Sequence, residues 1–159
     1  VPGRTCVNMN AVTPLRCARD FKNWIAVKEA SGDITQMDDI SKNKPANFDV
    51  ISGDDGITFP LITLGAVGII SVIGNAFPRE FSRMVRLALQ GDYANALTIH
   101  HKFAELFKRM FVDGNPAGVK AMLNGLGMLE NKLRLPLVPT RITTFEAIRK
   151  ILDELNIKC

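Results

Sequence analysis

The stretch WIAVKEASGD, residues 24–33, decides the predicted fold, because an apolar run enters a small polar loop directly after a lysine. The run before Lys28 lacks the polar alternation of a half-buried strand and is typical of parallel sheets. The runs FDVIS at 48–52 and VGIISV at 67–72 have the same composition. We therefore predict parallel strands here, each covered on both faces.

Helical segments separate these strands. ITQMDDISKN at 34–43 places apolar residues three apart, and ITFPLITLG at 57–65 is a short apolar helix that ends at Gly65. Strands and helices that alternate every 20 to 24 residues or so are typical of βα units. The sequence therefore predicts the α/β class.

The chain becomes helical after the third strand. We expect helices at about 78–90, 93–110, from 116 to Gly125 or Gly127, and at 143–155, with Asp92 as a cap and Gly91 as a stop. The predicted division is a βα portion at 1–91 and a helical portion at 92–159, packed as one unit. A closed eight-stranded barrel needs about 250 residues, so the predicted strands cannot close one. Either another chain covers the open edges, or the fragment rearranges, or the strands end in a small open sheet.

Composition excludes several classes of function. The chain has 159 residues, of which 47% are hydrophobic and 23% charged, as expected for one globular domain. Its longest apolar stretch, AVGIISVI, is far short of the roughly 18 residues of a membrane helix. The net charge of +4 comes from scattered basic residues, so we expect no nucleic-acid partner. The first residues resemble neither a signal peptide nor a natural start, and we expect an internal start.

The three cysteines, Cys6, Cys17 and Cys159, lack the close pairing of zinc or redox motifs. We expect reduced thiols in a cytoplasmic protein. The adjacent His100 and His101 point about 100° apart on a helix, so they cannot readily share a metal ion. No nucleotide fingerprint is present either. The sequence thus predicts neither a metal nor a cofactor.

Lys28 has two interpretations. It can pair with Glu29 or extend its ammonium group to solvent. Alternatively, it is a desolvated amine with a lowered pKa, able to attack a ketone and form an imine. Its place favours the second interpretation, because the carboxyl ends of parallel strands are where α/β folds carry their chemistry.

Two further segments point to the same end of the sheet. SGDDG at 52–56 follows the second strand, and we expect it to make a turn and a helix cap, since its spacing matches no calcium loop. Gly53 would let the backbone approach a ligand closely. Arg4 is predicted on a loop before the first helix, where a guanidinium group would suit an acidic substrate.

VPGRT, VKEASGD, SGDD, GIISV, NPAGVKAMLNGLG and LRLPLVP occur in this order along the chain. Together they resemble the dihydrodipicolinate synthase family, within the superfamily of pyruvate-dependent class I aldolases that includes N-acetylneuraminate lyase. The resemblance covers essentially the whole chain but only the C-terminal half or so of the family. It implies that the fold is the C-terminal part of a (β/α)8 TIM barrel, followed by a helical region.

The resemblance also implies an activity and a set of site residues. Lys28 would form the Schiff base with pyruvate, whose enamine adds to aspartate semialdehyde in lysine biosynthesis. Arg4 would lie at the entrance of the site and help to bind a carboxylate. Gly53 and Ile70 would line the pyruvate pocket through their backbones. The protein would be a homo-oligomer, or would pair with the missing N-terminal half of the barrel.

The departures from the family limit this expectation. The family's reactive tyrosine and its helper residues lie upstream of Val1, and the only tyrosine in this chain is Tyr93. Losing a positioned general acid or base costs about 10² to 10⁴ in rate, so we expect a truncated chain with low or no activity alone. Cys6 replaces a common glycine after VPGRT. The alternatives are another pyruvate aldolase, similar to N-acetylneuraminate lyase, and a non-catalytic half-barrel assembly module.

Overall fold

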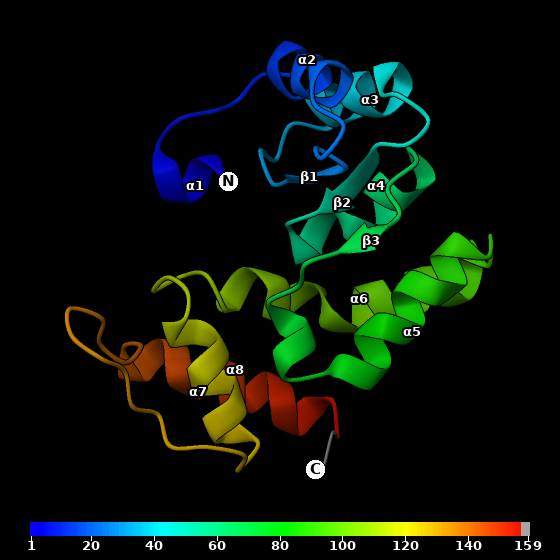
Figure 1. The fold of residues 1–159 in the computed structure, drawn as a ribbon. Coiled ribbons are helices and arrows are strands. Elements are labelled where there is room, and N and C mark those ends of the chain that lie inside the picture. The colour runs from blue at the N-terminus through cyan, green and yellow to red at the C-terminus, as the bar shows by residue number, and fades with distance from the viewer. Residues whose placement is uncertain (157–159) are drawn as a thin grey trace.

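The structure is a computed structural model and describes residues 1–156. Three short strands form a parallel sheet in the order β1-β2-β3, and helices pack around it (Figure 1). The strands are β1 (Ala26–Glu29), β2 (Asp49–Ser52) and β3 (Gly68–Ile69). The helices are α1 (Pro2–Thr5), α2 (Val12–Asp20), α3 (Ile34–Asn43), α4 (Thr58–Thr63), α5 (Pro78–Leu89), α6 (Tyr93–Arg109), α7 (Ala117–Gly125) and α8 (Ile142–Glu154), with 3₁₀ turns η1 (Asp55–Ile57) and η2 (Ile73–Asn75).

The predicted strands exist and are parallel, but β3 is shorter than the run VGIISV. Its ladder ends where the Ile70 N–H donates to the carbonyl of Ser52, at 2.9 Å. Beyond that point the N–H groups of Val72 and Ile73 donate to the carboxylate of Asp55 instead of to a strand. A side chain from the neighbouring loop therefore ends β3 while the apolar pattern continues.

The two faces of the sheet differ. Val50, Ser52 and Glu29 point to one face and are buried against the helices. On the other face, Lys28 is exposed, Ile51 is half-buried and Ile70 is 51% exposed. The prediction that both faces are covered is therefore wrong for the described residues. Periodicity failed here because an apolar run indicates a face suited to burial and not what lies against it. We call the second face the open face.

Local capping chemistry explains why most predicted helix ends were accurate. Asp33 accepts hydrogen bonds from the N–H groups of Thr35 and Gln36, so α3 begins at the predicted residue. Asp92 accepts from the Asn95 N–H at the start of α6, as predicted. Gly91 separates α5 from α6 with a φ of +83°, a conformation that glycine adopts without steric cost.

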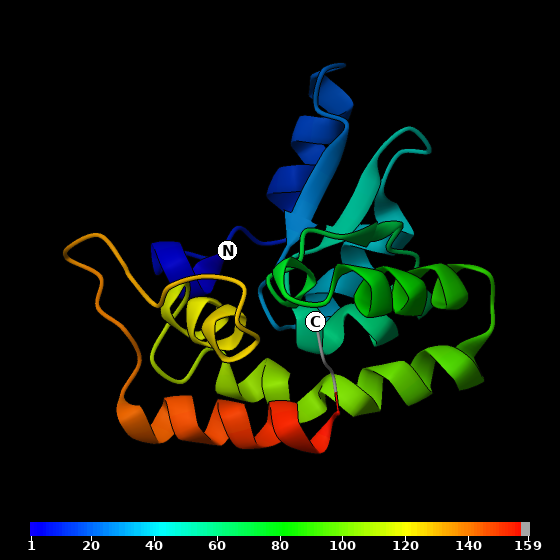
Figure 2. The same cartoon turned by 90° about the horizontal axis from the view of Figure 1, so that it is seen from below.

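One apolar core runs through both predicted portions of the chain. It joins Val50 of β2 to Phe103 of α6 and to Ile148 of α8. α6 packs against α5 and α8, and α8 also packs against α7 (Figure 2). The boundary at residue 91 between two units stays a prediction. No helix within residues 1–156 has the length and apolar character needed to cross a membrane.

His100 lies in an aromatic cluster between α4 and α6. Its ring centroid is 5.8 Å from that of Phe59 and 5.4 Å from that of Phe107, and its Nδ1 is buried without a hydrogen-bond partner among the described residues. Burial lowers the pKa of His100, and the charge of neighbouring His101 lowers it further. His100 therefore packs as an aromatic ring against α4.

This cluster predicts that stability falls in mild acid. The pKa of His100 is lower in the folded chain than in the unfolded chain, where it is about 6.5. Its contribution is therefore complete above that value and is lost as the pH falls toward the folded pKa, with a slope of at most about 1.4 kcal/mol per pH unit. Urea unfolding at pH 7.5 and 5.5 should show a smaller loss for His100→Phe than for wild type. Equal losses for wild type and His100→Phe would contradict the prediction.

Candidate functional site

The open face gathers three of the four residues predicted for the site. Lys28 pairs in register with Ile51, so β2 lies between Lys28 and β3. Ile70 follows β3 and, by strand alternation, faces the same side as Lys28. Gly53 follows β2, and a β-carbon placed on it would lie 2.8 Å from Cε of Lys28. The missing side chain at Gly53 therefore provides the space that the lysine stem occupies.

Lys28 stands near the carboxyl end of β1 with its side chain exposed. Within residues 1–156, its ammonium group has no ion-pair or hydrogen-bond partner. It lines a small pocket of about 60 Å³ together with Val1, Asn8 and Ala30, among others. Because its side chain is exposed, residues 1–156 do not give this amine the buried setting that was predicted.

Glu29 does not pair with Lys28, so the ion-pair part of the first interpretation is wrong, whereas the exposed Lys28 side chain agrees with its other part, an ammonium group that extends to solvent. Successive strand residues point to opposite faces, and Glu29 is buried on the helix side of the sheet. Its carboxylate accepts a hydrogen bond from the Ser31 N–H at 2.6 Å and another from Nε2 of Gln36 at 3.3 Å. These bonds fix the loop that follows Lys28, and Glu29 is not a partner of the lysine.

Arg4 lies in α1 and not on a loop, which corrects the prediction. The helix was missed because it is a single turn with no buried residue, so it has no periodic pattern to detect. Nη1 of Arg4 donates to the carbonyl of Asn115, at 3.0 Å. Arg4 and Gly53 line one pocket of about 340 Å³, shared with Asp54, Phe111 and Asn115. The structure thus brings Arg4 to the side of Gly53, as a shared site requires.

The acidic pair after β2 holds the loops of the site in place. Asp54 accepts from the Gly56 N–H at 2.8 Å and caps η1, as expected for SGDDG. Asp55 is buried, and its carboxylate accepts from the Ser71 hydroxyl as well as from two backbone N–H groups after β3. Burial raises the pKa of Asp55 despite these bonds. It connects the loops that follow β2 and β3, a link between distant residues that the sequence does not reveal.

The remaining predictions concern metals and cysteines. Within the described residues, no group of three or more metal-binding side chains comes together. Cys6 is exposed and adopts a φ of +56°, which glycine would adopt without strain. The resemblance leads one to expect a glycine at this position, and the positive φ gives the physical reason for it. Composition alone does not indicate this reason. Cys159 lies outside the described residues.

Sequence comparison places these residues in a known context. Residues 1–155 match the profile of the Dihydrodipicolinate synthetase family. The chain is 84% identical over 159 residues to a 4-hydroxy-tetrahydrodipicolinate synthase of Phocaeicola vulgatus, of which it covers 54%. It spans about half the length of the curated relatives it matches.

Solved structures agree with this similarity. Dihydrodipicolinate synthase from Thermotoga maritima superposes with a TM-score of 0.94 at 40% identity, and the match covers 98% of this chain and 54% of that one. The enzyme from Acinetobacter baumannii, solved in complex with pyruvate, gives a TM-score of 0.93 at 34% identity over 99% of this chain and 54% of that one. The sheet and its helices are therefore a partial α/β barrel, which confirms the predicted fold class.

Proposed function

Because the chain belongs to the dihydrodipicolinate synthetase family, we propose that its open face supplies the Schiff-base lysine of a pyruvate-dependent class I aldolase. The observation that carries the proposal is the position of Lys28 at the carboxyl end of β1, with its stem against Gly53 and its amine without a partner among residues 1–156. The amine adds to the ketone carbon of pyruvate, and the loss of one water gives the imine. Water accepts a proton from the methyl group, and the resulting enamine carbon bonds to the aldehyde carbon of aspartate semialdehyde while the aldehyde oxygen takes up a proton from water. A water molecule then adds to the imine carbon and frees Lys28.

Arg4, Gly53 and Ile70 bind substrate in this proposal. Arg4 binds the carboxylate of the acidic aldehyde, because a guanidinium group can donate two parallel hydrogen bonds to it. The pocket that Arg4 shares with Gly53 supports this role, since it opens beside the lysine stem. Gly53 and Ile70 present their backbones to pyruvate. A relative from Acinetobacter baumannii in complex with pyruvate supports that choice of keto acid.

We propose that the chain by itself has low activity. Imine chemistry is favoured by a site that excludes water, whereas Lys28 is exposed. The only tyrosine, Tyr93, packs edge-on against Phe59 with ring centroids 6.2 Å apart, so it supplies no acid or base to the open face. Cover over the open face, from a further barrel segment or another copy, would exclude water and raise the rate.

The same openness supports an assembly role. β1 and β3 are the edges of the sheet, and unpaired edges favour association with another segment or copy. The proposed form is a cytoplasmic homo-oligomer whose cysteine thiols are reduced. The exposure of Lys28 also favours a second candidate function, a non-catalytic half-barrel that serves only as an assembly module.

Borohydride reduction in the presence of pyruvate separates these two functions. The 159-residue chain is incubated with pyruvate and borohydride, digested, and its peptides are weighed. A pyruvate-dependent tag on the peptide that contains Lys28 supports the aldolase function. No tag at saturating pyruvate leaves only the assembly module. Supplying aspartate semialdehyde or sialic acid then distinguishes a synthase from a lyase of the N-acetylneuraminate type.

Replacing Gly53 by alanine is expected to slow this tagging roughly ten- to a hundredfold, because misplacing a reacting group by about 1 Å has costs of that order. The new β-carbon would lie 2.8 Å from Cε of Lys28 and 2.9 Å from the β-carbon of Ala30, so the lysine stem must move. The measurement is the initial rate of tag formation. Gly68→Ala, on the same face with nothing within 4 Å, is the matched control. Equal rates for Gly53→Ala and wild type would contradict the prediction.

A further inference from the structure

Arg4 is held in place by a distant turn more than by its own helix. α1 buries no residue, and no side chain caps its start. Nη1 of the Arg4 guanidinium group donates a hydrogen bond to the Asn115 carbonyl, at 3.0 Å. The direction of Arg4 therefore depends on where the backbone of Asn115 lies. We call residues 110–116, which join α6 to α7, the α6–α7 turn.

The α6–α7 turn is anchored by an acidic side chain at its centre. Asp113 accepts from the backbone N–H of Arg141 at 3.0 Å and from Nε of the same residue at 2.7 Å. The Asp113 side chain is only 14% exposed. A hydrogen bond from the Thr144 hydroxyl lowers the pKa of Asp113, and the bonds from Arg141 lower it further against some desolvation. The carboxylate thus ties the turn to the start of α8.

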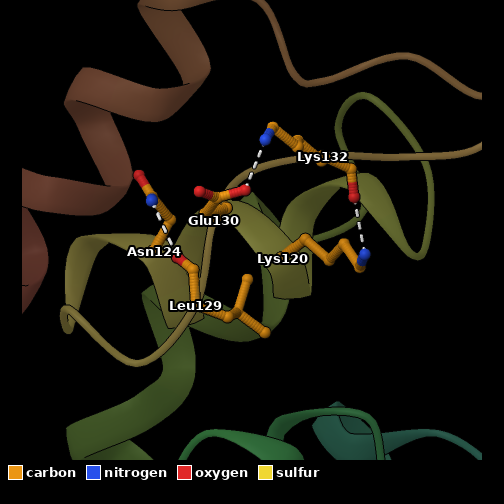
Figure 3. Close-up of polar contacts among 5 residues, drawn as sticks. All are labelled: Lys120, Asn124, Leu129, Glu130 and Lys132. Atoms are coloured by element: carbon orange, nitrogen blue, oxygen red, sulfur yellow. Dashed lines mark hydrogen bonds and ion pairs between the residues drawn. The ribbon is translucent and has the colours of Figure 1, made fainter.

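Arg141, which binds Asp113, follows a segment whose first half is hydrogen-bonded to α7. Residues 126–140, which we call the strap, run back over α7 before α8 begins (Figure 3). Nζ of Lys120 donates to the Lys132 carbonyl at 2.6 Å, and Nδ2 of Asn124 donates to the Leu129 carbonyl at 2.9 Å. Both donors belong to α7. The two bonds hold the first half of the strap against α7, and Arg141 follows the strap directly before α8 begins.

We infer that Asp113 is a positioning residue for Arg4. Its bonds to Arg141 fix the α6–α7 turn, the turn presents the Asn115 carbonyl, and that carbonyl directs the Arg4 guanidinium toward the pocket beside Gly53. Asp113 touches neither substrate nor Lys28. The inference rests on the proposed function for its catalytic meaning, because Arg4 selects an acidic aldehyde only if the site is an aldolase. The geometric part stands without it.

The test measures Arg4 itself. Phenylglyoxal bridges two guanidinium nitrogens, so the bond from Nη1 to Asn115 slows its reaction with Arg4. In Asp113→Asn, we expect the rate of Arg4 modification, followed by peptide mass, to rise about fivefold, as the loss of one charge-assisted hydrogen bond would give. Asp20→Asn is the matched control, because it removes the partner of another Arg Nε, in the exposed Arg16–Asp20 pair on α2. Its Arg4 rate should equal that of wild type.

Further readouts separate positioning from loss of structure. Arg141→Met keeps the backbone bond to Asp113 but removes the 2.7 Å contact, and it should raise the Arg4 rate in a chain with wild-type helical circular dichroism. If the chain proves active, Asp113→Asn should raise KM for the acidic aldehyde about fivefold with kcat unchanged, and should add nothing in an Arg4→Ala background.

The outcomes also separate this inference from the proposed function. Pyruvate tagging of Lys28 should be the same in Asp113→Asn as in wild type, because pyruvate does not need Arg4. A wild-type chain that takes no tag refutes the aldolase function but leaves the Arg4 measurement valid. Wild-type Arg4 rates in both Asp113→Asn and Arg141→Met would overturn the positioning role.

Discussion

Lys28→Arg is expected to abolish the pyruvate-dependent tag completely. Arginine keeps the length and the positive charge of the side chain, but its guanidinium group stays protonated and forms no imine under these conditions. The exposed position on β1 allows the substitution without burying a new charge, so folding should be unaffected. Loss of the tag with unchanged circular dichroism would therefore report chemistry and not stability.

The control for Lys28→Arg is Lys22→Arg. Lys22 is also exposed and lies in the turn before β1, so this variant tests whether replacing another exposed lysine affects the tag. In Lys22→Arg, Lys28 should take the tag at the wild-type rate. A pyruvate-dependent tag that survives Lys28→Arg and maps to another lysine would remove the basis for the proposed site.

Gly118→Ala is expected to destabilise the chain by about 3 kcal/mol or more, since overpacking against an immobile neighbour exceeds the usual cost of an added methyl group. A β-carbon at Gly118 would lie 1.9 Å from the carbonyl oxygen of Met110 and 2.6 Å from its Cα. Both atoms are backbone, and the Met110 side chain is fully buried, so neither can yield cheaply. α7 would have to move away from the end of α6.

Urea unfolding measures this loss as a shift of the midpoint. Gly3→Ala is the control, because a β-carbon on Gly3 meets nothing within 4 Å and its helical position tolerates alanine. That variant should stay within about 1 kcal/mol of wild type. A Gly118→Ala midpoint equal to that of wild type would show that α7 does not pack against Met110 as described. Because Gly118 follows the α6–α7 turn, partial unfolding should also loosen Arg4.

Several parts of the fold were predictable because the signal lies within a few residues. The start of α3 depends on Asp33 and the two N–H groups it caps, and the break between α5 and α6 depends on Gly91. Each of these is a local interaction whose chemistry can be recognised from sequence. The parallel order of the strands also followed from the strand and helix alternation, since a strand that returns after a helix runs in the same direction.

The site was less predictable because its contacts join distant residues. Lys28 and Gly53 were expected to lie together, since the carboxyl ends of neighbouring parallel strands meet at one edge. The bond from Arg4 to a backbone carbonyl at Asn115 has no side-chain signature at the receiving end. Asp55 was noticed in SGDDG, but its bonds to the N–H groups after β3 were not, because any capping carboxylate has the same local pattern.

By itself, the sequence determined the α/β class, the three parallel strands with the helices that follow them, and the lysine that stands at a strand end, because periodicity and capping act over one turn or one strand. Only the tertiary structure decided that Lys28 faces an open side of the sheet, that Glu29 points away from it, and that Arg4 is held by the α6–α7 turn. The physical reason is that burial and hydrogen-bond partners depend on which distant segments come together. An apolar strand specifies a surface to be covered, and the rest of the fold decides what covers it.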